Sequence, residues 1–445
     1  LREHGYYYLK SEHIGYQADT LAVPGRVWLR TVLSPETPKE ALRQWRIGKI
    51  TLRQLPEATD TPSVDLATDS VVLTDSISFH YAGKKLVRPG VLKTRIRIRP
   101  GRIYRSEDEE RTMAALTGLN AFSSVDFYFS KQEETTQPKT ILDSLAAPLP
   151  DSVNTQRPTF ASQPDSIGTL DLTILLRKEK PWSTYLGAAF MRKSTNYIGP
   201  GLSASVERNN VFGGGERLSA SVSGSYEWQT GRNPVDGYSV SINSYQLGAD
   251  LALTFPSILF PRLTDSYYKY PTSTSFKVAL QGINHARYYT LRSLSFTMDY
   301  NFQPSASWTH RITPLSLNYT RTTGRFEELI ADNPALGLSL RDQLIPKLSY
   351  AFTYSYRPDD KPHYLQLSGE VSEAGNLING AMALMKRPYH EMKTMFGVPF
   401  AQFAKASLDL RYSYRLSSRH TLATHFATGA IFAYGNATTA PYIEQ

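Results

Sequence analysis

Apolar and polar residues alternate over much of the C-terminal part of this chain. In the stretch RLSASVSGSYEWQ, residues 217–229, every second position from Leu218 to Trp228 is apolar or small. The intervening positions carry Arg217, a series of serines and Glu227. A period of two is typical of a β-strand that has one apolar and one polar face. A soluble sheet covers such an apolar face with a protein core, whereas a membrane barrel turns it toward lipid.

The same alternation recurs in about eleven segments after residue 181, each of roughly 10–15 residues. It is clear in 293–302, 347–357 and 405–416. Tilted strands of this length cross the hydrocarbon core of a bilayer. Short connections such as QPSA alternate with long ones such as TGRFEELIADNPALGLSLRDQ, as in outer-membrane barrels.

These features favour a transmembrane barrel over 181–445, and a soluble β-sandwich is the alternative. In a barrel, the polar face would bring charged side chains into the lumen, at Arg217, Glu227, Asp299, Asp409 and Arg411. In a sandwich, the same face would point outward to water. Tyrosine and tryptophan at the strand ends are typical of the interface girdle of a barrel.

Residues 42–180 mix strands and helices. A strand is expected at 45–52, a short helix within 87–98, and strands at 122–130 and 168–180. A second helix is expected to begin at Ser106, with Glu109 completing a capping box. The order is therefore strand, helix, helix, strand, strand. The segment at about 131–168 is rich in Ser, Thr, Pro and Gln, and we expect it to be a disordered insertion.

Residues 1–34 are expected to contain a helix end followed by a pair of strands, at 12–20 and 26–33. Residues 42–180 also end with a helix followed by two strands. We therefore expect the chain to start inside a domain of the same kind.

Composition narrows the classes of function. The chain has 445 residues and a formal net charge of +9, but its basic residues are scattered, so no nucleic-acid surface is expected. It has no cysteine, which excludes thiol catalysis, disulfides and cysteine-ligated zinc. The glycine-rich VFGGGE precedes a strand and not a helix, so it lacks the context of a phosphate loop. We therefore predict no enzyme activity, no cofactor and no metal site.

Four stretches resemble the BamA/TamA superfamily of outer-membrane assembly factors, whose periplasmic units are called POTRA domains. They are IGKI at 47–50, IRPGRIYRSEDEERTMAALTGLNAFSSVDF at 98–127, LDLTILLRKEKPW at 170–182 and VERNNVFGGGERL at 206–218. The opening segment, GYYYLK followed by IGYQADT, further resembles the TamA-like branch of Bacteroidota.

The resemblance implies an α+β periplasmic POTRA part followed by a transmembrane antiparallel β-barrel. Residues 1–34 would be the C-terminal part of one POTRA domain, 42–180 a second one with the insertion at about 131–168, and 181–445 the first part of the barrel. Family barrels have roughly sixteen strands, of which about eleven fit here. A lumen-loop Arg-Gly-aromatic motif of the family has no counterpart before Gln445, so we expect the chain to be a fragment.

The resemblance also implies a function in the outer membrane of a Gram-negative bacterium, with the N-terminal domains in the periplasm. POTRA domains would receive unfolded outer-membrane clients, and the barrel, embedded in lipid, would insert or translocate them. Periplasmic or inner-membrane accessory subunits would be further partners. A two-partner-secretion exporter and a passive porin are the alternatives, and the POTRA-like residues 42–180 argue against a porin.

The first barrel strand is expected at 182–193, with Trp182, Thr184, Leu186, Ala188 and Phe190 toward lipid. The residues at the centre of this strand have small side chains, which weaken pairing with a neighbouring strand. The free edge would therefore form a lateral gate that binds a client strand. The alternative is that small residues fit the curvature of the barrel. The residues assigned to the gate are Ser183, Tyr185, Leu186, Gly187, Ala188, Ala189 and Met191.

A glycine turn is expected between the second and third barrel strands. The residues assigned to it are Arg208, Asn209, Phe212, Gly213, Gly214, Gly215 and Glu216. We expect a positive φ at Gly214, so that valine there would cost stability. We expect Arg208 and Glu216 to lie at the water interface with little pairing energy.

Overall fold

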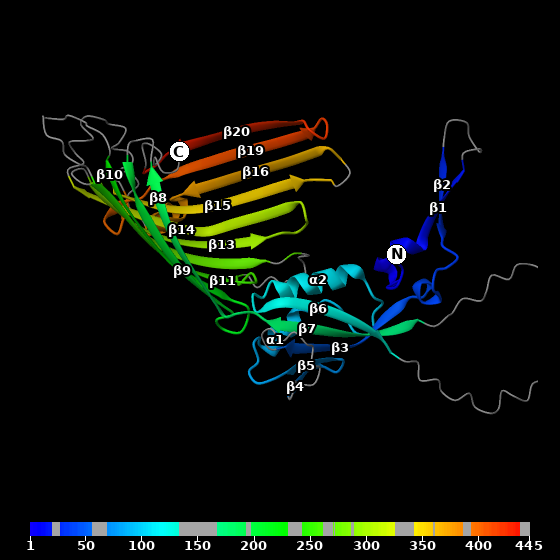
Figure 1. The fold of residues 1–445 in the computed structure, drawn as a ribbon. Helices are drawn as coiled ribbons and strands as arrows, with labels where there is room; N and C mark the ends of the chain where they lie inside the picture. The colour runs from blue at the N-terminus through cyan, green and yellow to red at the C-terminus, as the bar shows by residue number, and fades with distance from the viewer. Residues whose placement is uncertain are drawn as a thin grey trace, which may run out of the picture. The chain divides into compact units, whose positions relative to one another are not determined.

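The computed structural model describes residues 1–19, 27–55, 69–132, 167–192, 197–229, 243–260, 270, 272–285, 289–324, 342–358, 361–385 and 393–436. The chain divides into two compact units (Figure 1). One unit contains residues 1–117 and 122–178, and the other contains 118–121 and 179–445. The expected disordered insertion lies almost entirely within 133–166, which is outside the described residues.

The first unit is a mixed α/β structure. Its elements are the 3-10 turns Arg2–His4, Ser11–His13 and Lys39–Leu42, strands β1 (Ile14–Asp19), β2 (Trp28–Leu33), β3 (Trp45–Leu55), β4 (Asp69–Thr74), β5 (Ile77–Tyr81), β6 (Phe122–Lys131) and β7 (Gly168–Lys178), and helices α1 (Pro89–Arg95) and α2 (Ser106–Thr117). Strands β1 and β2 form an antiparallel hairpin, as predicted for the first 34 residues. The other strands form a five-stranded sheet in the order β4-β5-β3-β7-β6.

The predicted order of strand, helix, helix, strand, strand is present in this sheet, with one addition. Strand β3 runs parallel to β7, and β7 pairs antiparallel with β6. The hairpin β4–β5 was not predicted, and β5 adds parallel to the other side of β3. The alternating apolar residues of β3, β5 and β7 form the core with both helices; fully buried members include Ile50, Leu52, Phe79, Leu92, Leu116, Leu170, Leu172 and Ile174.

Helix α2 begins at Ser106 as predicted, but the expected capping box is wrong. The backbone N–H of Glu109 donates to Arg105 O, and its carboxylate accepts the Tyr104 hydroxyl at 2.5 Å. The carboxylate of Glu3 instead accepts hydrogen bonds from the Ser106 hydroxyl and from the Glu107 backbone N–H. An acidic side chain distant in sequence therefore stabilises the start of this helix.

The second unit is dominated by an eleven-stranded antiparallel sheet. Its strands are β8 (Trp182–Arg192), β9 (Tyr197–Asn209), β10 (Arg217–Gln229), β11 (Asn243–Phe255), β12 (Ser273–His285), β13 (Tyr289–Phe302), β14 (Trp308–Gly324), β15 (Gln343–Tyr356), β16 (His363–Ala374), β19 (Phe403–Arg415) and β20 (Thr421–Ala433). Each strand pairs with the next one in this order, so β16 pairs with β19, and β8 and β20 are the two edges. In the part of the chain that the structure describes, these edges do not pair with each other.

The alternation of the sequence becomes two continuous faces of this sheet. Directly paired residues share a face. One row across eight strands is apolar, and it contains Leu186, Ala204, Val222, Ala249, Leu280, Leu294, Tyr319 and Leu344. The adjacent row is polar or small, and it contains Gly187, Ser203, Ser223, Gly248, Gln281, Ser293, Thr320 and Gln343.

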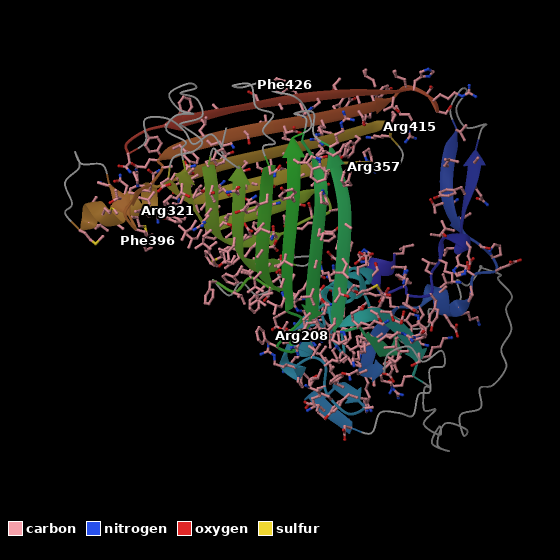
Figure 2. All side chains as sticks on the ribbon, turned by 60° about the vertical axis from the view of Figure 1, so that its left-hand side comes forward. Arg208, Arg321, Arg357, Phe396, Arg415 and Phe426 are labelled. Atoms are coloured by element: carbon pink, nitrogen blue, oxygen red, sulfur yellow. The ribbon has the colours of Figure 1, made fainter. Side chains whose placement is uncertain are left out.

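Much of the apolar face is exposed. Leu186 is 83% exposed, Leu247 60% and Phe426 58%. The charged residues predicted on the other face do lie in the register of the polar rows, Asp409 beside Ser368 and Arg411 beside Gln366 among them. Figure 2 shows side chains on both faces, with Arg321 and Phe396 at one end of the strands and Arg357 and Arg415 at the other.

None of the helices in the described ranges combines the length and the apolar character needed to cross a membrane.

Candidate functional site

Strand β8 is the edge of the sheet that comes first in the chain. It pairs antiparallel with β9, and Ala188, near its centre, lies opposite Leu202. Ten of its residues are exposed, and Gly187 is the one half-buried position. The other side of β8 has no partner strand among the described residues, so its outward backbone groups lack the bonds of a β-ladder. The predicted bounds of this strand, 182–193, agree with the structure to within one residue.

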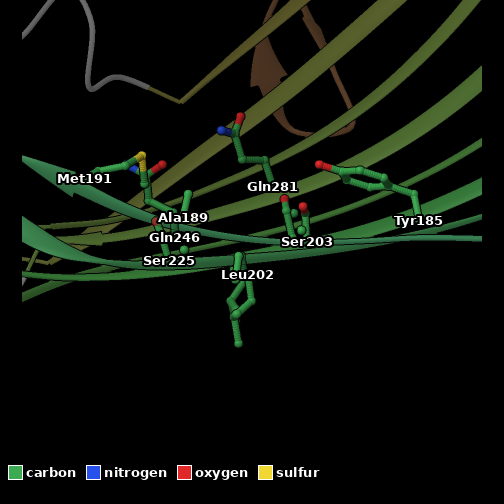
Figure 3. Close-up of a pocket in the computed structure, with 15 residues that line it drawn as sticks. Tyr185, Ala189, Met191, Leu202, Ser203, Ser225, Gln246 and Gln281 are labelled. Atoms are coloured by element: carbon green, nitrogen blue, oxygen red, sulfur yellow. The ribbon is translucent and has the colours of Figure 1, made fainter.

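The side chains of β8 alternate between the two faces as predicted. Figure 3 shows Tyr185, Ala189 and Met191 on the same side of the sheet as Gln281, and Leu202 on the opposite side. On the apolar side, Leu186 and Ala188 border a hollow with a volume of about 620 Å³. The outward-facing residues of β8 therefore continue the apolar face of the sheet.

A shallow pocket of about 330 Å³ lies on the polar side, against β8 and the next four strands. Its polar groups are neutral and belong to serine, glutamine and tyrosine; the side chains that reach it include Tyr185, Ser203, Ser223, Ser225, Gln246 and Gln281. Because these groups donate and accept hydrogen bonds without a net charge, the pocket suits an uncharged polar surface such as a peptide backbone.

Two of the four glycines that line this pocket, Gly187 and Gly201, are covered by larger neighbours. A Cβ atom added to Gly187 would lie 3.0 Å from the Tyr185 ring and 2.6 Å from Ser203 Oγ. A Cβ atom added to Gly201 would lie 3.2 Å from Met191 Cε. The sequence showed only that the residues at the centre of β8 have small side chains. In the structure, Tyr185 and Met191 fill the space that the missing side chains leave, as aromatic residues do beside glycine in other sheets.

The turn between β9 and β10 holds the glycines that were assigned to it, but the expected roles need correction. Positive φ angles occur at Asn210 (55°), Gly213 (77°) and Gly215 (87°), and not at Gly214. The expectation that valine at Gly214 would be opposed by a positive φ is therefore wrong. Positions 213 and 215 are the ones whose backbone conformation favours glycine.

Glu216 also differs from its predicted role. It is only 4% exposed, so it does not lie at a water interface. Its Oε2 atom accepts hydrogen bonds from the backbone N–H groups of Gly214, at 2.8 Å, and Phe212, at 3.2 Å. Arg208, at the other side of the turn, lies over the ring of Trp182 at 5.2 Å. The buried carboxylate therefore organises the turn, which no feature of the local sequence had indicated.

A charged cluster on the polar face was also missed. Asp409 Oδ2 lies 2.5 Å from His425 Nε2 on the edge strand β20, and Asp409 Oδ1 lies 3.0 Å from Arg411 Nε. Cross-strand register places Arg411 opposite His425, which a single strand's sequence cannot show. Within the described ranges, no group of three or more His, Cys, Asp or Glu side chains is arranged to hold a metal ion.

Comparison with known proteins gives structural similarities alone. No protein-family model matches the chain, and no curated protein matches it. Among solved structures, the chain is similar to BamA from Haemophilus ducreyi lacking POTRA domains 1–3, with a TM-score of 0.48 and 11% identity. This match covers 100% of the present chain and 64% of the BamA chain, so the chain spans less than two thirds of that structure.

The chain is also similar to CdiB from Acinetobacter baumannii and CdiB from Escherichia coli. For the first, the TM-score is 0.33 at 12% identity, covering 89% of this chain and 81% of that one. For the second, the TM-score is 0.35 at 11% identity, covering 92% and 82%. BamA is thus among the structures that the chain is similar to, as the sequence resemblance predicts.

Proposed function

We propose that this chain belongs to a BamA/TamA-type protein of the bacterial outer membrane that inserts or translocates other proteins. The observation that carries the proposal is the continuous apolar face of the eleven-stranded sheet, which ends at the edge strand β8, whose outer side pairs with no other strand among the described residues. In this proposal the protein is not an enzyme and needs no cofactor. Its substrates are unfolded outer-membrane proteins, and its surroundings are lipid on the apolar face and a water-filled lumen on the polar face.

Exposure of the apolar face supports a membrane location. Soluble proteins rarely expose a contiguous apolar patch larger than about a few hundred Å². Here every strand of the eleven-stranded sheet carries at least one exposed large apolar residue; examples are Leu186, Leu202, Val222, Leu247, Leu280, Leu294, Leu315, Tyr350, Val371, Leu408 and Phe426. Lipid would cover such a face without a second protein layer.

The five-stranded sheet of the first unit supports the assignment of a POTRA-like domain. Its edge strand β6 extends from Phe122 to Lys131, and Tyr128 on this strand is 57% exposed. An extended client segment could add to this edge through main-chain hydrogen bonds, which tolerate many client sequences. We place this unit in the periplasm and assign it the reception of unfolded clients.

The free edge of β8 is the proposed lateral gate. Unpaired backbone groups are costly in lipid, so a client strand that pairs with β8 would be stabilised there. Ser183, Tyr185, Gly187, Ala189 and Met191 would present the polar side of this edge to the client. Leu186 and Ala188 would present the side that faces lipid.

Two adjacent residues of β11 test the membrane location. Leu247 lies on the apolar face and Gln246 on the polar face, so arginine at each gives a matched pair. At the lipid face, arginine is expected to cost about 2–4 kcal/mol, whereas at the polar face it should cost little. We expect Leu247→Arg, and not Gln246→Arg, to reduce folding into phospholipid vesicles, measured by heat-modifiable migration on gels. Equal tolerance of both variants would contradict a lipid-facing sheet.

Client insertion tests the activity itself. The purified full-length protein, reconstituted into vesicles, should accelerate the folding of a urea-unfolded outer-membrane protein added from outside, compared with empty vesicles. A parallel preparation with the Leu247→Arg variant, which is expected to fold poorly into the vesicles, controls for nonspecific effects of the reconstitution. If the wild-type protein instead forms a stable open pore and leaves client folding unchanged, the two-partner-secretion alternative or a porin would replace this proposal.

A further inference from the structure

The described part of the connection between β16 and β19 is folded against the sheet. It contains helix α5 (Asn376–Leu384) and the short hairpin strands β17 (Thr394–Met395) and β18 (Val398–Pro399). Figure 2 shows Phe396, at the tip of this hairpin, at the end of the strands opposite Arg357 and Arg415.

One side of this connection packs on the apolar face of the sheet. Met382 of α5 and Phe400 cover Leu344, and all three are at most 8% exposed. Leu344 lies opposite Tyr319 at the end of the apolar row that begins at Leu186 on β8. Helix α5 therefore sits on the same face that the proposed function turns toward lipid.

The other side of the connection is apolar and exposed. Leu377 is 63% exposed, Leu384 87%, Met385 66% and Phe396 78%. The segment 376–385, NLINGAMALM, contains no charged residue. Surface helices of soluble domains usually carry charged residues on the face away from the core, and this one does not.

The backbone at the hairpin tip is unusual for an exposed aromatic residue. Phe396 has a φ of 54° and Gly397 a φ of 76°. For a residue other than glycine, this left-handed conformation costs roughly 1–2 kcal/mol, and asparagine or glycine would adopt it more readily. Because the Phe396 side chain is largely exposed, packing within the chain does not account for its presence. Such a conformation is a reason to look for a function outside the fold.

Hydrogen bonds link α5, the hairpin and Asn436 to one another. The Asn436 side-chain amide donates to the carbonyl oxygens of Lys393, at 2.7 Å, and Phe400, at 2.9 Å. Its Oδ1 atom accepts from the Lys393 N–H at 2.7 Å, and Lys393 Nζ donates to Asn379 Oδ1 on α5 at 2.6 Å. The exposed apolar side chains are therefore presented by a preorganised platform, which lowers the entropic cost of docking.

We propose that α5 and the hairpin tip at Phe396 form an interfacial anchor that docks at the boundary between the headgroups and acyl chains of the membrane. This inference rests on the proposed function, since it uses the same lipid-facing side of the sheet. Continuity with the apolar row favours lipid as the occupant, because a bilayer that covers Leu186 and Val222 also reaches the helix packed on Leu344. The uncharged helix fits an apolar environment, and an aromatic ring is favoured at the membrane interface.

Single cysteines with an environment-sensitive fluorophore test this proposal, because the chain has no cysteine of its own. Leu384→Cys and Phe396→Cys report on the anchor. Val371→Cys reports on the apolar face of β16, and Ser407→Cys on the polar face of β19. The labelled full-length protein would be reconstituted in phosphatidylcholine–phosphatidylglycerol vesicles with either brominated acyl chains in the lipid or iodide in the buffer as the quencher.

The expected result is quenching by brominated lipid at Leu384→Cys and Phe396→Cys, comparable to that at Val371→Cys and absent at Ser407→Cys. If Val371→Cys is quenched by lipid while the two anchor labels respond only to iodide, the anchor is refuted and the proposed membrane location stands. Protection of the anchor labels from both quenchers would indicate a protein partner and would also refute it. If Val371→Cys is not quenched by lipid either, the proposed function fails together with the anchor.

Discussion

The ring of Tyr185 lies over Gly187, two residues further along the same edge strand, where an added Cβ atom would come within 3.0 Å of it. This contact covers a position at which β8 would otherwise have no side chain on its polar side. We expect Tyr185→Ala to weaken the pairing of β8 with β9 by about 1 kcal/mol, which corresponds to roughly fivefold faster exchange. Hydrogen exchange of the peptide covering 182–192, followed by mass spectrometry, measures this.

Tyr364→Ala is the matched control, because Tyr364 lies on β16, remote in the sheet order from β8, and donates to Gln366 at 2.8 Å. It should leave exchange in β8 unchanged. Equal exchange in β8 for the wild type and Tyr185→Ala would mean that the ring does not support the strand.

A second prediction concerns the close approach of β9 and β10. A Cβ atom at Gly199 would overlap the backbone carbonyl oxygen of Tyr226, whereas one at Gly282 on β12 would meet nothing within 4 Å. Overpacking against backbone is expected to make Gly199→Ala destabilising by about 1–3 kcal/mol. Gly282→Ala should be neutral or stabilising, by up to about 1 kcal/mol, because it removes a strand-interior glycine. Urea titration of the reconstituted protein gives the unfolding midpoint of each variant, and similar midpoints for both would contradict this close approach of β9 and β10.

A third prediction concerns the buried carboxylate of Glu216. Glu216→Ala removes the acceptor of two backbone N–H groups, so we expect it to lower the free energy of unfolding by about 1.5–3 kcal/mol. Glu216→Gln keeps one oxygen acceptor and should cost less. The temperature at which the folded band disappears in a heat-modifiability gel orders the variants. A finding that alanine and glutamine are equally tolerated would return Glu216 to the solvent-exposed role expected from the sequence.

A fourth prediction separates the glycines of the same turn by their backbone conformation. Gly213 has a φ of 77°, and Gly214 does not have a positive φ. Gly213→Ala should therefore cost about 1 kcal/mol more than Gly214→Ala. The same gel assay measures both variants, and the reverse order would show that the turn has a different conformation.

The strands of the large sheet could be predicted because each shows its own period-two pattern. Val222 and Leu247 are apolar although they are exposed, so the alternation does not depend on knowing what covers the face. The hairpin β4–β5 was missed although Ile77, Phe79 and Tyr81 alternate, because the strands are short and surrounded by polar residues. The alternation of apolar and polar residues in ISFHY could have indicated strand β5 of this hairpin.

Other features could not be predicted because they depend on residues distant in the chain. Glu3 stabilises the start of α2 from about one hundred residues away, and Asp409 meets His425 only through the register of β19 and β20. The role of Glu216 depends on the φ angles of the turn, because these angles determine where the backbone N–H groups of the turn residues point. Helix α5 lies in a connection whose length is typical of a loop, and only its packing on Leu344 shows that it is part of the fold.

Site-specific crosslinking at the edge of β8 tests the proposed gate most directly. Single cysteines would be placed along 183–191 in the full-length protein, with a matching series on the last strand of a stalled client. Pairing at this edge predicts crosslinks that follow one fixed register along β8, with the strongest at alternate positions. If the protein inserts its client while crosslinks cluster on an interior strand such as 217–228, or occur nowhere on 183–191, β8 is not the gate.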